Sequence, residues 1–198
     1  MENFGNATWI DAKKVKSNTF ICWNCGKEIA SEIGYEARYQ GVGGGIYTKP
    51  LIYICHNCFA PNIRNTGNEM MLKPLPGKEI KKLPDNIKCV YNEARACMSV
   101  SAYTAAVMLF RKILMNISVE EGAEEGKDFT SYLGYLCKEG FVPRRQTKQA
   151  EQVKNLGNDA NHKIECRTKE EAEILFKFVE QFLITNYEFA DGVEGNDK

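Results

Sequence analysis

Apolar positions recur at helical spacing over the second half of the chain, from about residue 84 onward. The longest apolar run lies between Ser99 and Ile117 and carries no charge before Arg111. A surface helix needs a polar face, and this run has almost none, so it predicts the buried central helix of an α-helical domain, wrapped by its neighbours. Because a half-buried guanidinium needs a partner, we expect Arg111 to pair with a carboxylate such as Glu93.

Four further helices are predicted around this central one, each with an apolar face. They are expected to begin near Pro84, Asp128, Pro143 and Thr168. The last of them carries a capping box, Thr168-x-x-Glu171, directly ahead of an apolar run. The second half of the chain therefore predicts a five-helix domain.

Residues 1 to about 18 are polar with no clear period and are expected to form a lead-in at most. Residues 33–40 and 46–53 alternate between apolar and polar side chains, as strands do. Two short strand-like runs, residues 19–21 and 51–54, each lead directly into a Cys-x-x-Cys turn. The residues between these runs predict a β-hairpin whose tip is the glycine-rich run 41–45. That run lacks the Gly-Lys-Ser/Thr ending of a phosphate-binding loop, and no helical pattern follows it.

The two Cys-x-x-Cys turns predict a metal site. The cysteines concerned are Cys22, Cys25, Cys55 and Cys58. Each turn can present two thiolates, and four thiolates complete the tetrahedron of one structural zinc ion per chain. Because they leave no open position, this zinc is not expected to catalyse a reaction. The alternatives are four unrelated thiols or a redox Cys-x-x-Cys pair, which ordinarily sits at a helix start in a βαβ unit.

The predicted fold class is α+β, with a small β zinc ribbon followed by a mainly α-helical, five-helix domain. The expected parts are a zinc ribbon with an N-terminal lead-in at 1–60, a linker at 61–83, the helical domain at 84–190 and a disordered tail at 191–198. The linker is assigned from its Pro, Asn and Gly content, and the tail from its lack of apolar residues to bury.

Composition and charge narrow the possible partners. The 198 residues are 43% hydrophobic and 26% charged with a formal charge of zero, so no global field attracts nucleic acid or an anionic membrane. No apolar run approaches the ~20 residues of a membrane span, and the N-terminus has no signal-peptide core. We therefore expect a cytoplasmic protein without membrane association.

Candidate chemistry in the helical half centres on His162. The chain has two histidines, and the other lies inside a cysteine turn, so His162 is the ordinary candidate for acid–base chemistry near neutral pH. On a continuing helix, Lys154, Asn158 and His162 stand at successive i, i+4 positions, beside a gap at Gly157. The candidate ligand-binding residues are Arg111, Arg144, Arg145, Lys154, Asn158 and His162.

Three short motifs carry a resemblance to a known family. They are Tyr91-Asn92-Glu93-Ala94, Ala102-Tyr103-x-Ala105-Ala106 leading to Arg111, and Leu156-Gly157-Asn158-x-x-x-His162. Residues 84–188 resemble a HEPN-like family of domains of unknown function, which is also appended to type I restriction subunits and occurs in phage and defence-associated proteins. The resemblance implies an all-α bundle that commonly forms homodimers, with the polar motif at or near the dimer cleft.

Active HEPN ribonucleases use an arginine, usually followed by a polar residue, with a histidine four to six residues further on. By this resemblance Asn158 matches the polar residue and His162 the histidine, which makes them the candidate catalytic residues. Gly157 stands where the arginine is expected. Without that cation, cleavage loses the group that stabilises the developing phosphate charge, at a cost of ~3–4 kcal/mol. The sequence therefore favours a protein that is not an enzyme.

The predicted function is that of a non-catalytic binding or regulatory protein, which the resemblance assigns to the conflict between bacteria and phages or mobile elements. One alternative is a metal-independent HEPN-type ribonuclease that uses His162, with Arg144, Arg145 or Lys154 as its cation. Another is a nucleotide- or nucleic-acid-binding module. The expected partners are a second copy of the chain, in a homodimer, and either a protein or a nucleic acid or nucleotide.

Overall fold

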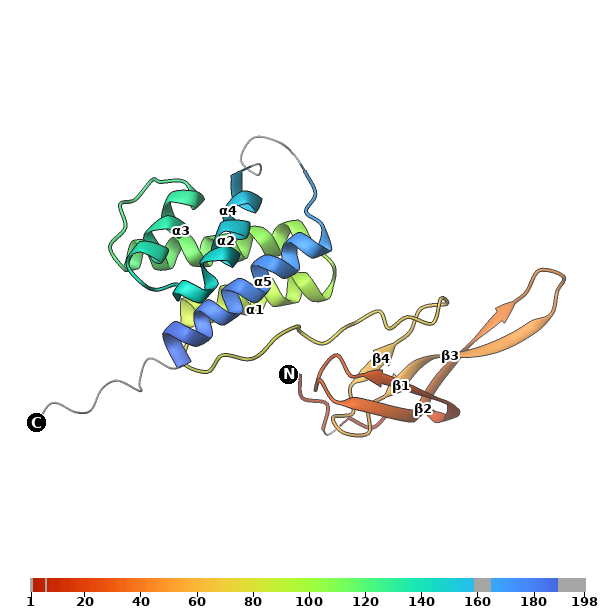
Figure 1. The fold of residues 1–198 in the computed structure, drawn as a ribbon. Helices are drawn as coiled ribbons and strands as arrows, with labels where there is room; N and C mark the ends of the chain where they lie inside the picture. Colours follow the sequence, from red (N-terminus) through yellow and green to blue (C-terminus); the bar gives the residue numbers. More distant parts are fainter. Residues whose placement is uncertain (1, 6, 159–164, 189–198) are drawn as a thin grey trace, which may run out of the picture. The chain divides into compact units, whose positions relative to one another are not determined.

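The protein is an α+β chain of two compact units, residues 1–75 and 76–198, shown in Figure 1. The computed structural model of this chain describes residues 2–5, 7–158 and 165–188. A small β-sheet builds the first unit and helices build the second, in the order that the sequence predicts. The predicted disordered tail, 191–198, lies outside the described residues.

Within its described part, the first unit is an antiparallel sheet of four strands in the order β1-β2-β3-β4. The strands are β1 (Lys13–Ile21), β2 (Glu28–Gln40), β3 (Ile46–Ile54) and β4 (Pro61–Ile63). β2 and β3 form the predicted hairpin, in which Gln40 pairs with Ile46 and residues 41–45 make the tip. β2 and β3 approach closely at Gly34, where a Cβ would lie 1.9 Å from the carbonyl oxygen of Ile52. The glycine is therefore needed for the pairing.

Two parts of this sheet lie where the sequence predicts no strand. β1 begins at Lys13, inside the polar stretch expected to be only a lead-in, and its Val15 is buried. β4 lies in the expected linker 61–83 and pairs with β3. Both differences have one cause. A neighbouring strand satisfies the backbone groups of these segments, and a weak side-chain pattern does not reveal that pairing.

The remainder of the expected linker packs on the helices from Pro76 onward. Arg95 donates from Nε to the Pro76 carbonyl at 2.7 Å and from Nη2 to the Gly77 carbonyl at 3.1 Å. Ile80 and Leu83 are buried in the core of the helical unit. This segment therefore belongs to the helical unit, although nothing in its local sequence is helical.

The described residues of the second unit form five α-helices. They are α1 (Asp85–Ser99), α2 (Tyr103–Glu120), α3 (Phe129–Lys138), α4 (Thr147–Asn158) and α5 (Lys169–Leu183). A 3₁₀ turn, η1 (Arg144–Gln146), precedes α4, and a π-helical turn, η3 (Ile184–Glu188), follows α5. α2 packs against α1, α3 and α5, so it is the predicted central helix (Figure 1). No helix in the described ranges is long and apolar enough to cross a membrane.

The central helix differs from its prediction in two ways. It begins at Tyr103, because Ser101 has a φ of 63° and interrupts the helical path after α1. Its neighbours also do not wrap it completely: Phe110 and Leu114 are fully buried, whereas Met108 is 66% exposed. An apolar side chain can line a cavity as well as a core, so composition alone does not separate the two cases.

The predicted capping box is confirmed at α5, and Asp128 caps α3 at the predicted start of that helix. Asp128 Oδ1 accepts a hydrogen bond from the Ser131 amide at 2.7 Å. At α5, Thr168 Oγ1 accepts from the Glu171 amide at 3.2 Å, and Glu171 Oε2 accepts from the Thr168 amide at 2.8 Å. These side chains satisfy amide groups that have no partner inside the helix, so they set where each helix starts.

Candidate functional site

The four cysteines of the two Cys-x-x-Cys turns meet at one place in the β unit. The Sγ atoms of Cys22, Cys25, Cys55 and Cys58 all lie within 4.8 Å of one another. The Cys22 and Cys58 sulfurs are 3.7 Å apart, and the Cys25 and Cys55 sulfurs are 3.8 Å apart. Tetrahedral coordination with metal–sulfur bonds of ~2.3 Å places the sulfurs ~3.8 Å apart. The cluster therefore fits one tetrahedrally bound metal ion.

Hydrogen-bond donors surround these sulfur atoms. The backbone donors to them are the amides of Lys27, Asn57, Cys58 and Ala60. Asn62 Nδ2 also donates to Cys22 Sγ, and Asn24 Nδ2 to Cys58 Sγ, each at 3.6 Å. Such donors favour anionic sulfur and hold each ligand in orientation. The site is thus supported by a second layer of contacts.

Burial and hydrogen bonding give the thiols different acidities. Burial disfavours the charged form of Cys55 and raises its pKa to about 12. Burial acts in the same direction on Cys25, but the Lys27 amide and the neighbouring thiols donate to its sulfur, and its pKa falls to about 7. A bound cation favours the thiolate at every ligand position because it attracts each negative sulfur.

Two tryptophans brace the second half of the cysteine site. Trp23 Nε1 donates to the Pro61 carbonyl at 2.7 Å, and Trp9 Nε1 donates to the Phe59 carbonyl at 2.8 Å. His56, between the two cysteines of the second turn, is exposed and is not part of the cysteine cluster. Four sulfurs fill a tetrahedron, so this arrangement could hold one ion and would leave no position on it for water or substrate.

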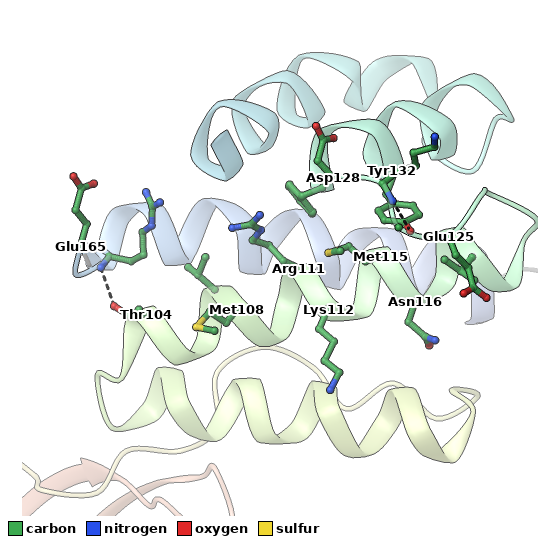
Figure 2. Close-up of a pocket in the computed structure, with 16 residues that line it drawn as sticks. Thr104, Met108, Arg111, Lys112, Met115, Asn116, Glu125, Asp128, Tyr132 and Glu165 are labelled. Atoms are coloured by element: carbon green, nitrogen blue, oxygen red, sulfur yellow. Dashed lines mark hydrogen bonds between the residues drawn. The ribbon is translucent and has the colours of Figure 1, made fainter. Parts of the chain in front are cut away.

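The helical unit contains a cavity of about 710 Å³ along α2, shown in Figure 2. Its wall is built by α2, the loop that leads to α3, the start of α3 and the residues before α5. The apolar lining residues are Val107, Met108, Met115, Val119, Phe129 and Tyr132. The charged lining residues are Arg111, Lys112, Glu125, Lys127, Asp128, Glu165 and Arg167. A volume of this size falls within the ~300–1,000 Å³ of small-molecule clefts.

Arg111 enters this cavity and does not pair with Glu93, so that expectation is wrong. The Arg111 guanidinium lies over the Phe129 ring, with Cζ 4.7 Å from the ring centroid. Among the described residues, no carboxylate lies within ion-pair distance of it, and Glu93 is exposed on α1. Burial, followed by the positive charge of Arg167, lowers the pKa of Arg111. An aromatic face thus replaces the expected carboxylate.

Sequence reasoning missed Arg167, which lines the same cavity. Its side chain is 8% exposed, and Nη1 lies 3.4 Å from Glu171 Oε1. Its backbone amide donates to Thr104 Oγ1 at 2.9 Å, which joins the residues before α5 to the start of α2. Its Nη2 is buried without a hydrogen-bond partner in the described part of the chain. The one available signal was a basic residue directly before the Thr168 cap.

The predicted ligand-binding residues do not gather in this cavity. Of those whose side chains the structure describes, Arg111 alone lines it. The two arginines of η1 are exposed, and Lys154 is half-buried on α4. Asn158 is the last residue of α4, but its side chain is not among the described parts of the structure. His162 lies outside the described residues.

The fold and these two sites define a class: a two-unit α+β protein with a four-cysteine site that could hold a metal ion and a helical unit with a ligand-sized cavity. Residues 92–194 match the model of a family described as a domain of unknown function, DUF4145. Since the match spans more than half of the chain, the protein belongs to this family. No curated protein and no solved structure matches the chain.

Proposed function

We propose that this protein is a non-catalytic binding protein, with one structural zinc ion in its β unit and a small-ligand site in its helical unit. The cavity along α2 carries this proposal. It combines an apolar wall with a few convergent charged groups, which is typical of ligand sites. Its two arginines, the half-buried Arg111 and the buried Arg167 side chain, are not groups that exchange a proton near neutral pH, as acid–base catalysis requires.

Zinc is the ion that the cysteine cluster suits best. Four thiolates in a tetrahedron favour zinc or iron over harder ions, and two strand-borne knuckles are the arrangement of a zinc ribbon. Cys22 and Cys55 are fully buried within the small core of the β unit. A metal at this position would tie together the two halves of that core, so its role is structural.

The resemblance to HEPN-like domains supplies the biological part of the proposal. It supports a regulatory role in the conflict between bacteria and phages or mobile elements, and a homodimer formed through the helical unit. Exposed apolar side chains on that unit, Val100 and Ile174, would gain from burial between two copies. Light scattering at micromolar concentration is expected to give twice the mass of one chain. A strictly monomeric species would contradict the dimer.

A ligand screen on the full chain tests the binding function. Thermal-shift measurements against a panel of metabolites are expected to find compounds that stabilise the helical unit. Met108→Trp adds bulk to an exposed residue of the cavity wall and is expected to abolish that stabilisation. Met71→Trp changes a methionine that is 60% exposed and lies in the other unit, outside the cavity lining, so it is the matched control and should leave that stabilisation unchanged.

The competing function is a ribonuclease that depends on His162. In a binding protein, His162→Ala leaves the background cleavage of single-stranded RNA unchanged, because there is no activity to lose. In a ribonuclease, the same substitution lowers cleavage by ~10²-fold or more, since proton transfer loses its carrier. Lys177→Gln, an exposed charge change on α5, serves as the control in both cases. RNA cleavage that requires His162 would overturn the proposed function.

A further inference from the structure

Two arginine residues, Arg111 and Arg167, line the cavity along α2. We propose that they bind the phosphate group of a small phosphorylated ligand whose apolar or ring-shaped body lies along the apolar wall of the cavity. This inference rests on the binding function proposed above and names the chemistry of the ligand at that same site.

Arg167 supplies the most direct observation. Its side chain is more than nine-tenths buried, and its Nη2 has no hydrogen-bond partner among the residues that the structure describes. A buried guanidinium donor without an acceptor costs free energy that a bound acceptor recovers. The ion pair with Glu171, at 3.4 Å, occupies Nη1 and leaves Nη2 available.

Arg111 presents its donors to the same cavity. The Phe129 ring contacts the guanidinium, with Cζ 4.7 Å from the ring centroid, and a cation–π contact of this kind does not use up the N–H donors of the arginine. Arg111 and Lys112 leave α2 in opposite directions, as Figure 2 shows, so Arg111 is the one of the two that approaches α3. The charge of Arg167 opposes the charge of Arg111, and an anion between them would relieve that repulsion.

Glu171 partly offsets the charge of Arg167, but no carboxylate of the described residues pairs with Arg111. Asp128 caps the start of α3. Glu171 has one oxygen in the capping box of α5 and the other near Arg167 Nη1. Glu125 and Glu165 are exposed, and neither forms an ion pair with a described residue. The cavity therefore keeps uncompensated positive charge at the position of Arg111.

A phosphate monoester fits this arrangement better than a carboxylate. It carries a charge of about −1.5 to −2 at pH 7 and offers three acceptor oxygens, enough for donors from two guanidiniums. The cavity of about 710 Å³ is larger than a phosphate alone requires. Met108, Met115 and Val119 supply an apolar surface for the remainder of the ligand.

Isothermal titration of the full chain with AMP, adenosine and inorganic phosphate tests the inference. AMP is expected to bind, and adenosine and inorganic phosphate are each expected to bind at least ~10-fold more weakly, because each lacks one half of the recognised structure. This comparison uses the unaltered protein, so it does not depend on how any variant folds.

Variants then assign the binding to the two arginines. Arg111→Gln and Arg167→Gln are each expected to weaken AMP binding by at least ~10-fold. Arg167→Lys keeps the charge but loses the planar fork, and is expected to fall between the wild-type protein and Arg167→Gln. Lys177→Gln removes an exposed charge outside the cavity and should bind AMP as the wild type does. Far-UV circular dichroism checks that each variant is folded.

Several results would overturn the inference. AMP affinity that survives both glutamine substitutions, adenosine binding as tightly as AMP, or no binding of either AMP or phosphate would each remove the phosphate assignment. If inorganic phosphate binds as tightly as AMP, the site recognises free phosphate, and the apolar wall does not contribute to binding an organic part of the ligand. Failure of the proposed function has a different signature, namely RNA cleavage that requires His162 or ligand binding that Met108→Trp does not disturb.

Discussion

The two units of this protein bury cores of different kinds. The β core is a small cluster in which metal-site cysteines stand beside ordinary apolar residues. Its buried members are Val15, Phe20, Cys22, Ile29, Tyr53, Cys55 and Ala60. The helical core is much larger and is built by all five helices and the segment before them, and the buried residues described there include no cysteine, histidine or carboxylate. A small core buries too little apolar surface to be stable alone, so we expect the β unit to depend on its ion.

The larger helical core has a different consequence. It leaves one side of the central helix α2 partly uncovered, and the cavity along α2 occupies that side. Each unit can be followed separately, because Trp9 and Trp23, the two tryptophans of the chain, both lie in the β unit. Tryptophan fluorescence therefore reports the folding of the β unit, and circular dichroism at helical wavelengths reports the folding of the helical unit.

The largest expected effect is the loss of the β unit when the cysteine site is broken. Cys22→Ser or Cys58→Ser removes one of four ligands, and the binding energy of a structural zinc ion is folding energy for a small module. Tryptophan fluorescence should report an unfolded environment while the helical circular dichroism stays unchanged. Chelation of the wild-type protein should have the same result.

Metal content is the direct control for that experiment. Elemental analysis of the folded wild-type protein is expected to give one zinc per chain, and the serine variants should carry much less. A well-folded preparation with less than half an equivalent of metal would contradict the dependence of the β unit on zinc. Cys89 is an exposed cysteine outside the cluster, so Cys89→Ser should change neither the zinc content nor the tryptophan fluorescence.

The reverse experiment breaks the helical core. Phe110 on α2 is fully buried and lies 5.5 Å from Phe176 between ring centroids. Phe110→Ala is expected to lower the free energy of unfolding of the helical unit by about 3–5 kcal/mol, since it removes buried apolar surface and leaves a cavity. Thermal melting followed by circular dichroism measures the loss. Zinc content and tryptophan fluorescence at low temperature should not change; if they do, the two units are not independent.

Arg95 provides a smaller test, of where the helical unit begins. It is buried, stacks on the Tyr91 ring at 5.5 Å and binds the carbonyls of Pro76 and Gly77. Arg95→Met keeps most of the volume but leaves these carbonyls without their donor, so we expect a loss of about 1–3 kcal/mol in the helical melt. Faster proteolysis near residue 77, measured by mass spectrometry, should accompany it. Unchanged proteolysis would place this segment outside the helical unit.

The smallest expected effect is at a helix cap. Thr168→Ala removes the side chain that accepts from the Glu171 amide at 3.2 Å and should cost about 1 kcal/mol in the helical melt. Thr168→Ser keeps the acceptor oxygen and is the matched control. A serine variant as unstable as the alanine variant would show that the hydroxyl does not provide the stabilisation.

The sequence by itself determined the features that depend on local spacing. Two Cys-x-x-Cys turns after strand-like runs, the glycine-rich hairpin tip and the capping box of α5 each involve residues a few positions apart, and each appears in the structure. Helical periodicity likewise identified the five helices of the second unit. Such features follow from backbone geometry over one or two turns of chain, which a sequence displays directly.

Only the tertiary structure decided which distant residues meet. It replaced the expected Arg111–Glu93 pair with the Phe129 ring, and it placed Arg167, unremarkable in sequence, beside Arg111 with a buried donor left over. It also recruited residues 61–63 into the sheet and the segment from Pro76 onto the helices. Local periodicity tells which face of an element is apolar but not which neighbour covers that face, because contacts between segments far apart in the chain depend on how all the elements pack at once.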